Sequence, residues 1–305
     1  MWKYILICNR DPAAFSPKLT KYCYYLIQEN INMTLKEVCE SICLPDQMIR
    51  KVLDFAGGFD EKTVKPFSAA LYDPSTWEKG VKEIAGVLGE DPDGSKMLTF
   101  MLLRAVETHR EYEKRGISET IFTDTIKFCT RFIKEHYEVY GTYEFTWGWW
   151  FPRQVSLREF RIGALEYEMI EKEENKLINI HIPADADMRR ESLRNSYEEA
   201  REFFAKYFPE YGQSDMVCDS WLLSPVLAKL LLESSNIVRF QKTFDLIRVD
   251  DTNDSSIRWV YGRTDIPIHE LPEHTSLQKK IKACLLEGSS IGAAYGRLQE
   301  DPWKG

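Results

Sequence analysis

The sequence has few cysteines at the spacings of disulfide or zinc-binding motifs, and it has no long apolar run near its start. Its seven cysteines are an odd number at scattered positions, which argues against a disulfide framework. Cys39 and Cys43 have the spacing of one helix face, but no second ligand pair with zinc-like spacing follows. We therefore expect buried free thiols and no metal. The apolar run at residues 4–8 is too short for a membrane span or a signal peptide, so we expect a cytoplasmic protein with no membrane partner.

The sequence also lacks an excess of basic residues. It has 40 lysines and arginines against 48 aspartates and glutamates, whereas a protein that clamps a nucleic-acid backbone needs a basic face. The net charge of -8 therefore predicts no nucleic-acid partner. The length of 305 residues exceeds the usual size of one domain, so two domains are expected. The sequence does not indicate an oligomeric state.

Residues 1–140 are predicted to form an all-α N-terminal domain. A helix is expected from Pro17, because proline suits the first helical turn, and Thr34 with Glu37 forms a capping box for the next helix. Two short helices within residues 34–53 have the spacing of a helix-turn-helix, which leaves a DNA-binding regulator as an alternative. The second helix offers only two cations, so we favour a helical hairpin of the core. Further helices are expected at residues 75–88, 94–115 and 119–140.

The hydrophobic period changes from helical to alternating at Gly141, where we place the start of a second domain, residues 141–305. The predicted order is β-β-β-α-β-α-β-β in a mixed sheet, which makes the chain an α+β protein. The glycine-rich residues 288–296 follow a helix and not a strand, so we expect a loose C-terminal segment and no phosphate loop. The expected strands are 142–151, 158–171, 177–183, 216–222, 244–250 and 257–262, and the expected helices are 196–208, 225–242 and 276–286.

One stretch combines a strand, a polar turn and the start of a helix. In residues 177–183 the isoleucines point to one face and His181 to the other, and a proline ends the strand. The expected N-cap of the following helix is Ser192, Asn195 or Ser196.

Such a helix start is an anion site, because its unsatisfied N–H groups point outward at the positive end of the helix dipole. The composition of this turn suits a pyrophosphate, and the alternative is a solvated surface turn. Asp185 is expected to cap the turn. The residues expected to bind the anion beside it are Arg189, Arg190, Ser192, Arg194 and Ser196.

The order of elements resembles the core of the GNAT acyltransferases, and several motifs resemble one bacterial family of acyltransferase-domain proteins. That family has a helical N-acyltransferase N-terminal domain and a GNAT-like C-terminal domain. The motifs are RIGALEYEM at 161–169, IHIPADA at 180–186, SYEEAREFF at 196–204, CDSWLLSP at 218–225, SNIVRFQKTF at 235–244 and HTSLQKKI at 274–281.

The resemblance implies that acyl-coenzyme A is the co-substrate. Its pyrophosphate would lie at the turn after the central strand, and its thioester in the gap between that strand and residues 216–222. One departure concerns the turn itself. GNAT enzymes carry a glycine-rich loop that closes on the phosphates, whereas no glycine lies between Pro183 and Ser196.

An acyltransferase of this kind implies direct attack of an amine on the thioester, which needs a base, an oxyanion donor and an acid for the leaving thiolate. We assign His181 as the base, Glu168 as a carboxylate that acts directly or through water, and Ser220 as the proton donor. The alternatives without a catalytic role are that His181 is a hydrogen-bonded histidine of the core and that Glu168 is a surface acid. An acyl-enzyme on Cys218 is a further alternative, although buried strand cysteines are usually inert. Asn236 either lines the cofactor groove or caps a helix.

The predicted function is transfer of an acyl group from acyl-coenzyme A to an amine of a small-molecule acceptor. The alternative is a non-catalytic ligand-binding or regulatory protein on the same scaffold. The aromatic run at residues 142–151 is interpreted mainly as core packing, with a wall for an apolar acyl or acceptor group as the second possibility.

Overall fold

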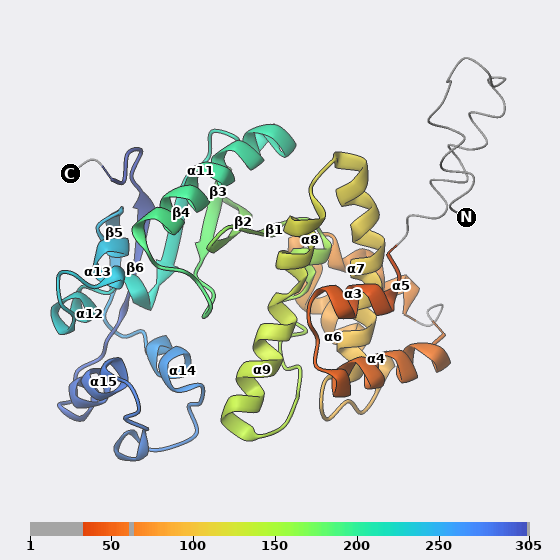
Figure 1. Cartoon of the computed structure of the whole chain (residues 1–305), viewed down its shortest axis with the longest axis horizontal. Helices are drawn as coiled ribbons and strands as arrows, with labels where there is room; N and C mark the ends of the chain where they lie inside the picture. The colour runs from red at the N-terminus through yellow and green to blue at the C-terminus, as the bar shows by residue number, and fades with distance from the viewer. Residues whose placement is uncertain (1–32, 61–63, 304–305) are drawn as a thin grey trace, which may run out of the picture.

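The computed structural model describes residues 33–60 and 64–303, and it divides them into a helical region and a mixed sheet (Figure 1). The helix predicted from Pro17 lies outside the described residues. The helices of the first region are α3 (Leu35–Ser41), α4 (Asp46–Gly58), α5 (Lys65–Ser68), α6 (Trp77–Leu88), α7 (Ser95–Arg115), α8 (Glu119–Ile126), α9 (Phe128–Tyr140) and α10 (Pro152–Val155), with 3-10 turns at Ala69–Leu71 and Pro74–Thr76.

The α3–α4 pair is a hairpin of the core. Thr34 forms the expected capping box at the start of α3, and the two helices bury Val38 and Met48 where they pack against α7. Cys39 is a buried free thiol, as expected, but Cys43 is exposed in the turn between the helices, where its φ is 55°. The helical hairpin favoured from the sequence is therefore confirmed, and the expected burial of both cysteines is wrong for the second.

The second region is a six-stranded sheet in the order β1-β2-β3-β4-β6-β5. The β3–β4 pair is parallel, and the other neighbouring pairs are antiparallel. Helix α11 makes the crossover that a parallel pair requires, and it lies along one face of the sheet (Figure 1). The strands are β1 (Glu159–Ile162), β2 (Leu165–Lys172), β3 (Asn175–His181), β4 (Asp215–Ser220), β5 (Phe244–Asp250) and β6 (Ala293–Leu298).

The helices of the second region connect these strands. They are α11 (Arg190–Tyr207), α12 (Pro225–Leu230), α13 (Asn236–Gln241), α14 (Ser255–Tyr261) and α15 (Ser276–Leu286), with 3-10 turns at Pro209–Tyr211, Trp221–Leu223 and Ile268–Glu270. The predicted helix at 225–242 is thus divided into α12 and α13. The α+β class, the helical first region and the mixed sheet of the second are as predicted.

Two expected strands at the start of the second region are wrong. Residues 142–151 form no strand; they lead through turns into α10. The long alternating run at residues 158–171 is not one strand but the hairpin of β1 and β2, because Gly163 takes a φ of 60° and reverses the chain. The first strand of the sheet therefore begins at Glu159, after the Gly141 at which we placed the start of the second domain.

Two further corrections concern the C-terminal part. Residues 257–262 are not a strand but lie in and just after α14, whose C-cap Gly262 has a φ of 72°. Residues 293–298, most of which lie in the segment that we expected to be loose, form β6 between β4 and β5. A side chain at Gly296 would meet the Phe244 side chain, so this strand needs small residues to fit between its neighbours.

One hydrophobic core runs from the helical region through the sheet to α11, and a smaller cluster lies under α12, α14 and α15. The larger core includes Val38 near the start of the described chain and Leu298 near its end, so the two regions fold against each other. Among the described residues, no helix is long and apolar enough to cross a membrane.

Candidate active site

The parallel strands β3 and β4 separate at their C-terminal ends. Their ladder pairs residues as far as Asn179 with Val217 and then stops. Beyond that point, residues 180–184 and 219–222 line opposite sides of a cavity of about 290 Å³. The gap predicted between the central strand and the next one is therefore present, and it opens toward the helical region.

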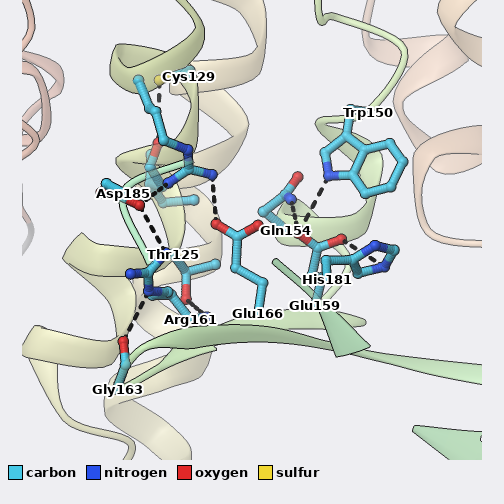
Figure 2. A network of polar contacts seen from close by, with 12 residues as sticks. Thr125, Cys129, Trp150, Gln154, Glu159, Arg161, Gly163, Glu166, His181 and Asp185 are labelled. Atoms are coloured by element: carbon cyan, nitrogen blue, oxygen red, sulfur yellow. Dashed lines mark hydrogen bonds and ion pairs between the residues drawn. The ribbon is translucent and has the colours of Figure 1, made fainter. Parts of the chain in front are cut away.

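One face of β1, β2 and β3 carries a group of polar side chains, of which Glu166 and His181 border this cavity. The register places Glu159 opposite Glu168 and Glu166 opposite His181, so these side chains project to the same face. Figure 2 shows Glu159, Glu166 and His181 above the sheet, among side chains from the helical region. Glu168 and His181 thus lie on adjacent strands and on the same face, and their roles in the chemistry stay predictions.

His181 and Glu168 form a hydrogen-bonded pair. The His181 Nε2 donates to Glu168 Oε2 over 2.9 Å, and no described residue hydrogen-bonds to Nδ1. Burial lowers the pKa of His181, but the bond to Glu168 and the charges of the nearby glutamates outweigh it, so the net pKa is raised. This tautomer leaves the Nδ1 lone pair as the basic atom, and the ring lines the cavity with 23% of its side chain exposed.

Arg153 of α10 holds the other oxygen of Glu168. Its Nε lies 3.0 Å from Glu168 Oε1, and its guanidinium lies 4.0 Å from the ring centroid of Trp150. Burial raises the pKa of Glu168, but the contacts with His181 and Arg153 lower it further than burial raises it, so the carboxylate stays charged. A charged Glu168 orients the imidazole and stabilises its protonated form.

Glu159 is a buried acid that the sequence did not single out. Trp150 Nε1 and Gln154 Nε2 both donate to its Oε1, over 3.2 and 2.8 Å. Its Oε2 has no hydrogen-bond partner among the described residues and lies 3.9 Å from His181 Nε2. Burial raises the pKa of Glu159 to about 8, so the proton that it carries at neutral pH belongs on Oε2, the oxygen that faces the histidine.

Glu159, Glu168 and His181 also meet the spacing of a metal site, since their ligand atoms lie within 4.8 Å of one another. The guanidinium of Arg153 beside Glu168 disfavours a second cation there, and the histidine nitrogen that faces both acids is already bonded to one of them. We therefore interpret the three residues as a network that shares protons.

A second ion-pair group joins α9 to the turn after β3. Arg131 lies 2.7 Å from Glu166 and 3.5 Å from Asp185, and Arg161 lies 3.1 Å from the same Asp185 oxygen (Figure 2). Burial lowers the pKa of Arg131, but these acids raise it further. Asp185 therefore holds the turn against the helical region and does not face the start of α11.

Aromatic side chains from three parts of the chain form one side of the cavity. We call this set the aromatic wall: Phe132 of α9, Trp147, Trp149 and Trp150 before α10, and Trp259 of α14. In the aromatic run at residues 142–151, Phe145 and Phe151 are buried in the core, as we expected, whereas the three tryptophans border the cavity.

Two protein-family models match the sequence with this architecture. The N-acyltransferase N-terminal domain matches residues 33–157, and the GNAT-like C-terminal domain matches residues 159–298. The protein belongs to the GNAT-like N-acyltransferases. The two matches meet just before β1, and they cover the region that the motif resemblance covered. No curated protein matches the sequence.

Solved structures with the same fold are also acyltransferases. One, in complex with decanoyl-CoA and teicoplanin, is 20% identical with a TM-score of 0.73, and the match covers 86% of this chain and 87% of that chain. Another, in complex with CoA and 10C-teicoplanin, is 19% identical with a TM-score of 0.74 over 86% of each chain. At this identity the likeness shows that the N-acyltransferase shares their fold.

The helix start that we predicted as the pyrophosphate site differs from expectation. Helix α11 begins at Arg190, earlier than predicted, and its N-cap Arg189 makes no side-chain capping bond. Asp187 takes the place of a cap: its carboxylate accepts bonds from the Arg189 backbone N–H and the Ser192 hydroxyl. The expected N-caps are therefore wrong. Ser196 lies buried inside the helix of the acyltransferase and donates to Ile162 O over 2.6 Å.

The three arginines of this turn point to different partners. Arg189 pairs with Asp187, Arg190 donates to the carbonyl of Trp303 and lies over its ring, and Arg194 is exposed near Glu198. They do not converge on one point in this structure. Arg190 and Arg194 remain at the surface of the first turns of α11.

The remaining predicted residues lie on β4 and α13. Ser220 lines the cavity across from His181, and its hydroxyl accepts a bond from the Leu222 N–H. Cys218 is fully buried, and burial raises the pKa of its thiol far above the ordinary value, which makes the acyl-cysteine route unfavourable. Asn236 is the first residue of α13, and the helix cap is its neighbour Ser235.

Proposed function

We propose that the protein transfers an acyl group from acyl-coenzyme A to the amine of a small-molecule acceptor by direct attack on the thioester. The observation that carries this proposal is the His181–Glu168 pair at the cavity where β3 and β4 separate. The solved relatives with this fold were crystallised with acyl-CoA or CoA, and two of them with teicoplanin or a derivative of it. Those complexes support a coenzyme A thioester as the donor.

The proposed proton path uses two groups at the cavity, His181 Nδ1 and the Ser220 hydroxyl. The neutral amine attacks the thioester carbonyl, and His181 Nδ1 takes the proton that the nitrogen loses as the new C–N bond forms. The C–S bond then breaks, and Ser220 gives its hydroxyl proton to the departing thiolate. The proton held by His181 returns to Ser220 through water, so that one amide and one thiol leave and both side chains are restored.

The pyrophosphate is proposed to lie near the start of α11, where Arg190 and Arg194 would exchange their present contacts with Trp303 and Glu198 for the phosphates. Asp187 already places a carboxylate at this helix start, and the turn has no glycine that would let the backbone close on a phosphate. We therefore propose that coenzyme A binds weakly, with the carboxylate opposing the phosphates.

Isothermal titration with coenzyme A and with decanoyl-CoA tests the donor. Saturable binding of both is expected, and removal of the Asp187 charge in Asp187→Asn should tighten it by about two- to fivefold, the range of a charge at a helix end. Glu202→Gln is the matched control, because it removes one negative charge from an exposed position further along α11 and should leave the affinity unchanged. Absence of binding to folded protein would favour the non-catalytic alternative.

A further inference from the structure

The aromatic wall leads from the proposed base to the surface of the molecule. At its inner end, Trp150 meets the His181 ring edge to face, with the centroids 5.0 Å apart. In the middle, Trp147 stacks on Phe132 at 3.9 Å and an interplanar angle of 15°. At the outer end, Trp259 lies 5.8 Å from Trp147. The wall is therefore one continuous aromatic surface that starts beside the base.

The outer part of the wall is exposed. Trp149 and Trp259 expose 49% and 47% of their surfaces, although both border the cavity. Large exposed aromatic side chains that gather at one opening are typical of binding sites, because packing alone gives no reason to leave them in water. The apolar face of the same sheet shows the contrast: its aromatic residues Phe160 and Tyr167 are both fully buried.

Charged side chains also border the cavity beside the rings. The Arg258 guanidinium lies 5.0 Å from the Trp147 ring centroid, and Glu135 and Asp219 also border the cavity. An aromatic surface with charged groups at its edge is complementary to a ligand that has an apolar face and a polar rim. A linear alkyl chain would use the aromatic surface without its flatness and would leave these groups unused.

We propose that the aromatic wall binds the ring of the acceptor, so that the acceptor is an amine attached to a ring that has an apolar face. This inference rests on the proposed function, because it places the reacting amine at His181 and the ring outward along Trp147 and Trp259. An aryl ring and a sugar ring both present such a face. The wall is contributed jointly by α9, the segment before α10 and α14, so the helical region and the sheet region both select the acceptor.

Steady-state kinetics with three amines tests this assignment. The probes are phenethylamine for an aryl ring, glucosamine for a sugar ring and hexylamine for a linear chain, each with acetyl-CoA as donor. We expect a lower KM for a ring amine than for hexylamine. Trp259→Ala should raise the ring amine's KM by about two- to tenfold, as loss of an aromatic pair would, and leave hexylamine unchanged. The ring probe that shows the effect identifies the source of the ring.

Tyr72→Ala is the matched control, because Tyr72 is a 45% exposed aromatic residue of the helical region that does not border the cavity. Equal KM values for all three amines, or an equal effect of Trp259→Ala on each, would overturn the inference. So would a Trp259→Ala effect on decanoyl-CoA but not on the amines, which would assign the wall to the acyl chain.

The inference can fail independently of the proposed function. Calorimetry of each amine with the protein in the absence of a donor measures the affinity of the aromatic wall directly, even if no acyl transfer occurs. Ring-amine binding that Trp259→Ala weakens supports the wall. Acyl transfer to hexylamine with no preference for ring amines would support the proposed acyltransferase activity and contradict the proposed role of the aromatic wall.

Discussion

On strands β1 and β2 the two faces of the sheet are almost equally buried but chemically opposite. The face toward α11 carries residues such as Phe160, Tyr167 and Ile180, packed against the aromatic side chains of Phe203 and Phe204. Alternate residues on the same strands give the other face, which carries Glu159, Glu166, Glu168 and His181 toward the helical region. Exposed fractions do not distinguish them, since Phe160 is 0% exposed and Glu159 is 1% exposed.

This difference separates what holds the fold from what the protein does. Burying apolar rings contributes stability directly, whereas burying carboxylates costs desolvation that their partners offset only with good geometry. Here the partners come from another part of the chain: Arg131 from α9, and Arg153 and Gln154 from α10. The helical region is therefore part of the candidate active site, and we propose that the polar face is retained for chemistry.

The largest effect is expected on the polar face, where His181→Ala removes the proposed base. We expect kcat to fall by about 10²- to 10⁴-fold, the usual contribution of a positioned acid or base. The melting temperature should change little, since the ring is partly exposed at a cavity. Single-turnover transfer from acetyl-CoA and a thermal melt measure the two quantities on the same samples.

His274→Ala serves as the control for that variant. His274 is exposed ahead of α15, far along the chain from the site, and its loss should alter neither rate nor stability. A rate for His181→Ala close to that of wild type would mean that another group takes the proton. A large loss of stability would assign the residue to the fold.

The opposite result is expected on the apolar face. Phe204 of α11 is fully buried, and Phe204→Ala should lower the free energy of unfolding by about 3–5 kcal/mol. The activity per folded molecule should stay near that of wild type, because the side chain lies across the sheet from the cavity. Urea denaturation measures the stability, and Glu198→Ala on the exposed side of α11 is the control, with a change within about 0.5 kcal/mol.

A loss of kcat in folded Phe204→Ala that matched that of His181→Ala would contradict the separation of the two faces. It would show that packing on the α11 side sets the position of β3 finely enough to control the chemistry.

Local patterns predicted the central part of the sheet well. The alternation in residues 177–183 predicted β3, and it placed His181 on the polar face, where its side chain meets that of Glu168 on the adjacent strand. The prediction failed where a single glycine reverses the direction of the chain. The turn at Gly163 divides one alternating run into two strands. Because we did not predict that turn, we could not predict that Glu159 lies opposite Glu168.

Two other errors have physical causes that the sequence does contain. Ile257, Val260 and Tyr261 follow helical spacing and face the smaller core, but the alternation of Trp259 with its neighbours suggested a strand. In β6, glycine and alanine suggested a loose segment, whereas close packing between two strands is what requires small residues at Gly296.

The partners of the site could not have been predicted, because they depend on how distant segments pack. Arg131 and Arg153 reach the polar face only when α9 and α10 lie against β1 and β2. Asp187 replaced the expected caps of α11 because its carboxylate reaches both the Arg189 backbone and the Ser192 hydroxyl, and that contact depends on the local turn.

The smallest effect at neutral pH is expected from Glu159→Gln. Glu159 is held mainly neutral at pH 7, because burial raises its pKa to about 8. Glutamine keeps the shape and the neutral charge, so kcat at pH 7 should stay close to that of wild type. Glu159→Ala would instead strand the Trp150 and Gln154 donors and should cost stability at every pH.

The pH dependence gives the Glu159→Gln variant its signature. Between pH 4.5 and 8 the unfolded wild type loses the Glu159 proton while the folded state keeps it, so wild-type stability falls as pH rises, by up to about 1.4 kcal/mol per pH unit. The variant has no such proton, so its stability relative to wild type should rise across this window and level off above pH 8. The other charged groups around Glu159, namely His181, Glu166, Glu168 and Arg153, are present in both proteins. Parallel stability curves from pH 5 to 9 would show that Glu159 is already ionised at neutral pH, and the polar face would then carry one more negative charge beside His181 than we infer.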